Sequence, residues 1–88
     1  MKVRAIKLQS QSLEEILELA CNEMEKSFVK HGSAQWGRHE FYGILQEEIA
    51  ELWDCLKTDS GKPMLEAEAL QVIAVILRFL STGDKYAN

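Results

Sequence analysis

The chain has 88 residues, of which 47% are apolar and 27% are charged, and its formal net charge is −4. This size and balance are typical of one globular domain with a core of modest size. The acidic balance argues against nucleic acid or an anionic membrane as a partner, because both select clustered Lys and Arg, and no stretch reaches the roughly 18 consecutive apolar residues of a membrane span.

Residues 1–10 alternate charged and apolar side chains and fit either a short extended arm or a helical lead-in. They lack the apolar central run of a signal peptide. The two cysteines, Cys21 and Cys55, have no second pair that would indicate a disulfide framework. We therefore expect a cytoplasmic protein whose thiols pack on helices.

The first helix is predicted from a capping sequence, Ser12-Leu13-Glu14-Glu15, in which Ser12 and Glu15 have the spacing of a capping box. Apolar residues then follow at helical spacing, namely Leu13, Ile16, Leu17, Ala20, Met24 and Phe28. This pattern predicts a helix to about Lys30 that ends at Gly32. Residues 31–38 contain two glycines and no periodicity, which indicates a loop.

A second helix is predicted over residues 39–57 and a third over residues 63–80, with a turn at residues 58–62 between them. Pro63 suits a first helical turn, and Ser81-Thr82-Gly83 provides the end. No alternating run elsewhere competes as a strand. The expected fold class is all-α, with residues 1–88 forming one small bundle of three main helices.

The third helix is unusually apolar, since between residues 69 and 80 only Gln71 and Arg78 are polar. A helix that is apolar on every side is expected to be buried on every side. Two other helices are too few to cover it, so this sequence predicts contact with another subunit and assembly into a larger helical bundle.

Acidic residues gather at the edge of the apolar face of the second helix. At about 100° per residue, that face carries Phe41, Leu45, Ile49, Leu52 and Leu56. Glu48 lies at its edge, followed around the helix by Glu51, then Glu47 and Asp54. Like charges one turn apart repel, and burial raises their pKa values further unless a cation compensates both effects.

The third helix supplies the complementary groups. Glu68 and Gln71 share a face, and antiparallel packing beside the second helix would bring them toward Glu48 and Glu51. Oxygen-only ligands select magnesium, manganese or calcium over zinc or copper, and an incompletely coordinated magnesium suits a triphosphate substrate. The competing interpretation is an ordinary solvated face of glutamates.

These acids resemble the signature of the MazG-like, all-α nucleoside triphosphate pyrophosphohydrolases, which is E-E-x-x-E in one helix and E-x-x-D in the next. The first motif is Glu47-Glu48-Ile49-Ala50-Glu51, the second aligns with Glu68-Ala69-Leu70-Gln71, and the resemblance covers about residues 30–80. It implies Mg²⁺-dependent hydrolysis, with Mn²⁺ as a possible substitute, of a nucleoside triphosphate to monophosphate and pyrophosphate by a homodimer or homotetramer. It also implies that Glu48, Glu51 and Glu68 bind the metal, and that Glu47 is a further ligand or orients the attacking water, which makes Glu47 and Glu48 the catalytic candidates.

Gln71 departs from the family pattern, which has Asp at this position. An amide oxygen can bind a metal, but Gln71 removes one negative charge and cannot act as a base. The alternative function is therefore a non-catalytic helical oligomer of the same fold that binds a nucleotide, a structural cation or a protein partner.

Four further residues are candidates for substrate binding. Trp36, His39 and Trp53 can stack on a base, although a tryptophan at helical spacing also suits a core and His39 also suits a helix start. Arg78 can meet phosphate oxygens or pair with a glutamate of a neighbouring helix. The sequence contains no P-loop, Ser/His/Asp set or Cys-x-x-Cys motif, so those chemistries have no support.

Overall fold

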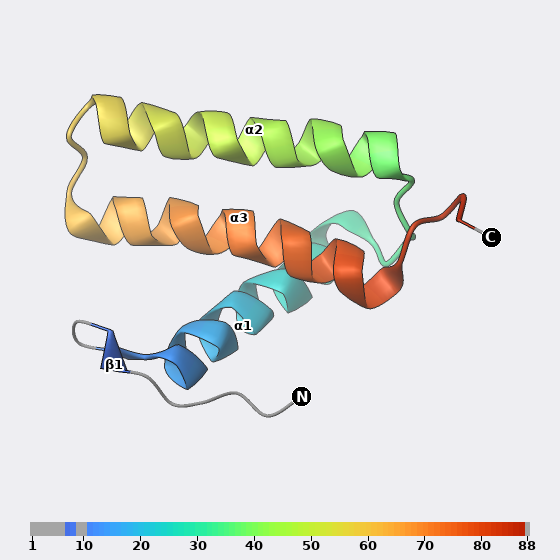
Figure 1. Ribbon diagram of the computed structural model, residues 1–88, viewed down its shortest axis with the longest axis horizontal. Coiled ribbons are helices and arrows are strands. Elements are labelled where there is room, and N and C mark those ends of the chain that lie inside the picture. Colours follow the sequence, from blue (N-terminus) through green and yellow to red (C-terminus); the bar gives the residue numbers. More distant parts are fainter. Residues whose placement is uncertain (1–6, 9–10, 88) are drawn as a thin grey trace.

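The computed structural model describes residues 7–8 and 11–87, and its architecture is three long helices with one short strand pair (Figure 1). The elements run in the order β1 (Lys7–Leu8), β2 (Gln11–Ser12), α1 (Leu13–His31), α2 (Arg38–Lys57) and α3 (Lys62–Thr82). The all-helical prediction and its three main helices are confirmed.

The strand pair precedes α1. β1 and β2 are antiparallel, with Lys7 opposite Ser12 and Leu8 opposite Gln11. Positions 7 and 8 of the predicted arm are thus extended, whereas residues 1–6 and 9–10 of that arm lie outside the described residues.

Local signals set both ends of α1. The Ser12 hydroxyl accepts a hydrogen bond from the Glu15 backbone N–H at 3.2 Å, which satisfies a donor that the first helical turn leaves free. Gly32 ends the helix with a φ of 78°, a left-handed value that glycine adopts at little cost. The expectation that both thiols are packed is wrong for Cys21, whose side chain is exposed on this helix.

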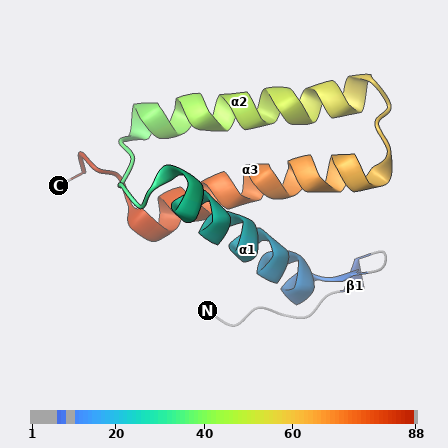
Figure 2. The same cartoon turned by 180° about the vertical axis from the view of Figure 1, so that it is seen from behind.

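α2 and α3 form an antiparallel hairpin, and they lie side by side in both views (Figures 1 and 2). The rings of Phe41 and Phe79 stack with centroids 4.1 Å apart, which joins the start of α2 to the end of α3. α2 begins one residue before its predicted start, and α3 extends to Thr82, two residues past its predicted end. Gly83, with a φ of 78°, provides the stop.

α3 is the central helix, because α2 packs on one flank and α1 crosses the other (Figure 1). Within the described helices, the fully buried positions are Ala20, Ala74 and Arg78. α1 and α2 leave part of α3 uncovered in a single chain, as the sequence predicted, since Leu80 is 73% exposed and Met64 is also exposed. None of the helices formed by residues 11–87 is long and apolar enough to cross a membrane.

The segment after α3, residues 84 and 85, binds the residues that connect α1 to α2. The Lys85 N–H donates to the Trp36 carbonyl at 2.8 Å, and Arg38 Nε pairs with Asp84 Oδ2 at 2.6 Å. Gly37 lies between them, and a Cβ at this position would come within 2.5 Å of the exposed Tyr86 ring, so a larger residue would force that ring to move. These contacts fix Trp36 beside the cavity described below.

Candidate metal centre

Three carboxylates meet between α2 and α3. Glu48, Glu51 and Glu68 each place one oxygen within 4.8 Å of the other two. Glu51 lies six residues before the end of α2 at Lys57, and Glu68 lies six residues after the start of α3 at Lys62. In an antiparallel hairpin, equal distances from the turn bring two residues level, so this register places the two acid motifs side by side.

Two oxygens of this cluster are buried without a hydrogen-bond donor, Glu48 Oε2 and Glu68 Oε2. Burial, followed by the neighbouring carboxylate of Glu51, raises the pKa of Glu48, and the same two causes raise the pKa of Glu68. A buried acceptor with no donor costs free energy comparable to a lost hydrogen bond. A hard divalent cation would remove both the missing contacts and the repulsion, so these oxygen donors fit Mg²⁺ or Mn²⁺.

The remaining predicted acids lie outside this cluster. Glu47 is exposed and lines the neighbouring cavity. Asp54 is exposed and forms an ion pair with Lys57 at 3.2 Å. The structure thus separates three converging carboxylates from one group beside the cavity and one at the surface.

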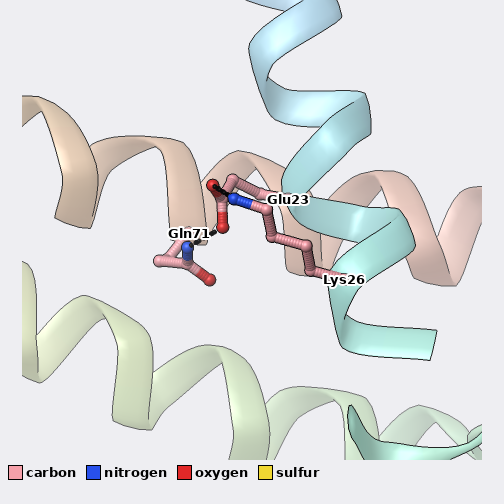
Figure 3. A network of polar contacts seen from close by, with 3 residues as sticks. All are labelled: Glu23, Lys26 and Gln71. Carbon is pink, nitrogen blue, oxygen red and sulfur yellow. Dashed lines mark hydrogen bonds and ion pairs between the residues drawn. The ribbon is translucent and has the colours of Figure 1, made fainter. Parts of the chain in front are cut away.

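Gln71 reaches toward α1 as well as toward α2. Its Nε2 donates to Glu23 Oε2 at 2.7 Å, while Glu23 Oε1 accepts from Lys26 Nζ at 3.0 Å (Figure 3). The bond from Lys26, followed by that from Gln71, lowers the pKa of Glu23. The sequence analysis did not identify Glu23, although its spacing from Ala20 and Ser27 places it on the inward stripe of α1.

A cavity of about 370 Å³ adjoins the acid cluster. Its wall combines Glu47 and Glu48 of α2, Gln71 of α3 and Trp36 of the loop. This volume is in the range of small-molecule sites. Because Glu48 belongs both to the cavity wall and to the carboxylate cluster, a molecule held in the cavity would lie next to the candidate metal ligands.

Arg78 also lines the cavity, but its guanidinium is engaged by the protein itself. The side chain is 1% exposed and donates to Ser27 and to the carbonyls of Gly32 and Ala34. Its guanidinium carbon lies 4.1 Å from the centroid of the Trp36 ring, on which it stacks. These contacts tie the end of α1 and the following loop to α3. The Arg78 Nε is nevertheless buried without a hydrogen-bond partner among the described residues, and the carboxylate of Glu40 on α2 opposes the lowering of the Arg78 pKa by burial, so contact with a phosphate or with a glutamate of a neighbouring helix stays a prediction.

The other aromatic candidates lie away from the cavity lining. His39 is exposed in the first turn of α2. Trp53 is 56% exposed, with Lys57 Nζ 5.8 Å from its ring centroid, so it is not a core residue of a single chain. Of the four substrate-binding candidates, Trp36 and Arg78 are the two that reach the cavity.

No family model, curated protein or solved structure that was compared with the chain matches it. The MazG-like assignment therefore stays a prediction. It is supported by the two acid motifs and by the geometry that brings their carboxylates together.

Proposed function

We propose that the protein is a Mg²⁺-dependent nucleoside triphosphate pyrophosphohydrolase of the MazG-like type. The observation that carries this proposal is the convergence of Glu48, Glu51 and Glu68, in which two carboxylate oxygens are buried without donors. A solvated face of glutamates would leave those oxygens in water. Their burial favours a bound cation over the solvated interpretation.

Each residue of the site has a role in this proposal. Glu48, Glu51 and Glu68 would hold Mg²⁺ or Mn²⁺, with the Gln71 oxygen in the fourth position. When bound, the metal supplies positive charge for phosphate oxygens and acidifies a coordinated water. Glu47 lines the cavity, and its proposed role is to accept a hydrogen bond from the attacking water and so to orient it.

The adjoining cavity is the proposed site of the nucleoside. Ile44, Ala74 and Val75 give it apolar surface, while Trp36 contributes an aromatic ring. Arg78 stacks on that ring and is held by carbonyls, so its proposed contribution is to fix the orientation of Trp36. A nucleoside held there would have its triphosphate next to the carboxylates, because Glu48 belongs to both the cavity wall and the cluster.

We also propose that the chain assembles as a homodimer or homotetramer. Large apolar side chains on the surfaces of α2 and α3 are uncovered in one chain, among them Trp53, Met64 and Leu80. Exposed large apolar side chains are typical of protein interfaces when they lie together on one face. A second copy would bury the part of α3 that α1 and α2 leave exposed.

One observation favours the second candidate, a non-catalytic helical module of the same fold. Gln71 is neutral, and its amide nitrogen is already bound to Glu23, so the two motifs supply one negative charge fewer than the MazG-like pattern. Fewer charges weaken metal binding. Such a module would use the carboxylates for a structural ion.

Turnover assays separate the two candidates. The protein with Mg²⁺ would be incubated with a panel of ribo- and deoxyribonucleoside triphosphates, and products would be resolved by ion-exchange chromatography. We expect equal amounts of monophosphate and pyrophosphate, lost in Glu48→Gln and retained in Asp54→Asn, a matched change of an exposed acid on the same helix. A folded protein that binds Mg²⁺ and turns over no nucleotide would support the non-catalytic module instead.

A further inference from the structure

We propose that Glu23 is a positioning residue that holds the Gln71 amide with its oxygen directed to the metal site. The inference rests on the proposed function, because it assigns Gln71 the fourth ligand position. Glu23 lies on α1, outside both acid motifs, so this assignment adds a third helix to the site.

The chemistry of the contact fixes the orientation of the amide. An ionised carboxylate only accepts hydrogen bonds, so Gln71 must present its NH₂ group to Glu23, and the two groups meet at 2.7 Å. The amide oxygen then lies on the other side of the amide carbon. Figure 3 shows that oxygen on the side of the amide opposite Glu23. Gln71 and Glu48 line the same cavity, which is the basis for proposing that this oxygen faces the carboxylates.

Glu23 is itself held in place. Lys26 Nζ binds its Oε1 at 3.0 Å, which leaves Oε2 for Gln71, and the Glu23 side chain is only 27% exposed. Its neighbours at spacings of three and four residues, Ala20 and Ser27, face α3 and the cavity. The carboxylate is therefore anchored from both sides, as a group that orients a metal ligand must be.

The contact between Glu23 and Gln71 also offsets part of the negative charge that is missing because position 71 is Gln and not Asp. A carboxylate that accepts from an amide NH₂ polarises the amide, and its carbonyl oxygen becomes a better acceptor and ligand. In the MazG-like motif the ligand itself carries the negative charge. In this chain the charge lies on Glu23, which accepts a hydrogen bond from the ligand Gln71. Gln71 thus stays neutral while its oxygen gains part of the effect.

Metal binding without any nucleotide tests this role. Mn²⁺ affinity would be measured by titration calorimetry for Glu23→Leu, Glu23→Gln, Gln71→Leu and the double variant Glu23→Leu/Gln71→Leu. The control is Glu25→Leu, which removes an exposed carboxylate from the same helix. Thermal melting in chelator would verify that each variant is folded.

We expect Glu23→Leu to weaken Mn²⁺ binding about tenfold, a typical effect for a group that orients a metal ligand, and Glu25→Leu to leave it within about twofold. Glu23→Gln retains an acceptor oxygen but loses the charge that polarises the amide, so it should lose less affinity than Glu23→Leu. The double variant should bind no more weakly than Gln71→Leu alone, because both changes remove the same contact.

Three results would overturn the inference. The first is an unchanged Mn²⁺ affinity in Glu23→Leu. The second is a loss of affinity in Glu23→Gln as large as that in Glu23→Leu, and the third is a pair of additive losses in the double variant. The second and third results would mean that Glu23 acts through its charge alone. In each of these cases the wild-type protein still binds Mn²⁺ and the proposed function stands. A folded wild-type protein that binds no Mn²⁺ refutes the metal site itself, and the inference with it.

Discussion

Replacing Glu48 by Gln should stabilise the metal-free protein and abolish its response to Mg²⁺. The substitution keeps the shape of the side chain and removes one negative charge from a cluster whose oxygens lie within 4.8 Å of one another. It also supplies an NH₂ group that can donate to Glu51 or Glu68. An ordinary core substitution would instead lower stability.

The separation of the carboxylates sets the size of the effect. Two unit charges 4.8 Å apart repel by about 0.9 kcal/mol in water and by about 3.5 kcal/mol at an effective dielectric constant of 20. Because Glu51 is exposed to solvent, the lower figure governs. With two pairs relieved, we expect the free energy of unfolding to rise by about 1–2 kcal/mol, which raises Tm by roughly 5–15 °C in a domain of this size.

Thermal melts followed by circular dichroism, in chelator and in excess Mg²⁺, would measure both effects. A ligand at one hundred times its Kd stabilises the native state by about 2.7 kcal/mol, so the wild-type Tm should rise with Mg²⁺ while that of Glu48→Gln stays constant. Asp54→Asn is the matched control and should show a wild-type response. A Glu48→Gln variant that is less stable than wild type in chelator would refute the repulsion argument, and one that still responds to Mg²⁺ would refute the ligand assignment.

Two further predictions concern pH and the buried arginine. Because the pKa values of Glu48 and Glu68 are raised above about 4.5, the folded state binds more protons than the unfolded state in that window, so metal-free protein should lose stability as pH rises through it. Glu23, with a lowered pKa, adds stability that is lost as pH falls below about 4.5. Urea unfolding at a series of pH values, with and without Mg²⁺, would measure both effects. The loss of stability with rising pH should appear only without the metal. Arg78→Met should cost about 1.5–3 kcal/mol in urea unfolding, since the carbonyls of Gly32 and Ala34 lose a charged donor. Arg78→Lys should recover less than half of that loss, because a lysine cannot keep the stacked, forked geometry, and wild-type stability in either variant would contradict this account.

The helices were predictable because the residues that end them act locally. Ser12 caps α1 through a backbone donor three residues away, and Gly32 and Gly83 adopt φ values that other residues rarely take. Pro63 fits the first turn of α3, where its missing N–H costs nothing. Each signal depends on a few neighbouring residues, and a sequence displays such neighbours directly.

The carboxylate cluster was predictable for a related reason. Helical periodicity places Glu48 and Glu51 on one face of α2, and the short turn before Lys62 leaves an antiparallel hairpin as the compact arrangement of α2 and α3. Equal distances from that turn bring Glu51 level with Glu68. Periodicity and a short turn are thus sufficient to bring acids 17 positions apart into one cluster.

The crossing of α1 was not predictable in the same way, because the loop before α2 imposes no register. Arg78 shows the consequence: its partners on α1 and the loop are 44 to 51 residues away, and no local pattern marks them. Glu23 meets Gln71 across 48 residues in the same way. The motif alone shows only that Gln71 lacks the negative charge of an Asp. The fold shows that the carboxylate of Glu23 accepts a hydrogen bond from the Gln71 amide. The surroundings of an acid motif therefore depend on helices that the motif does not include, as the contact between Glu23 of α1 and Gln71 of α3 shows.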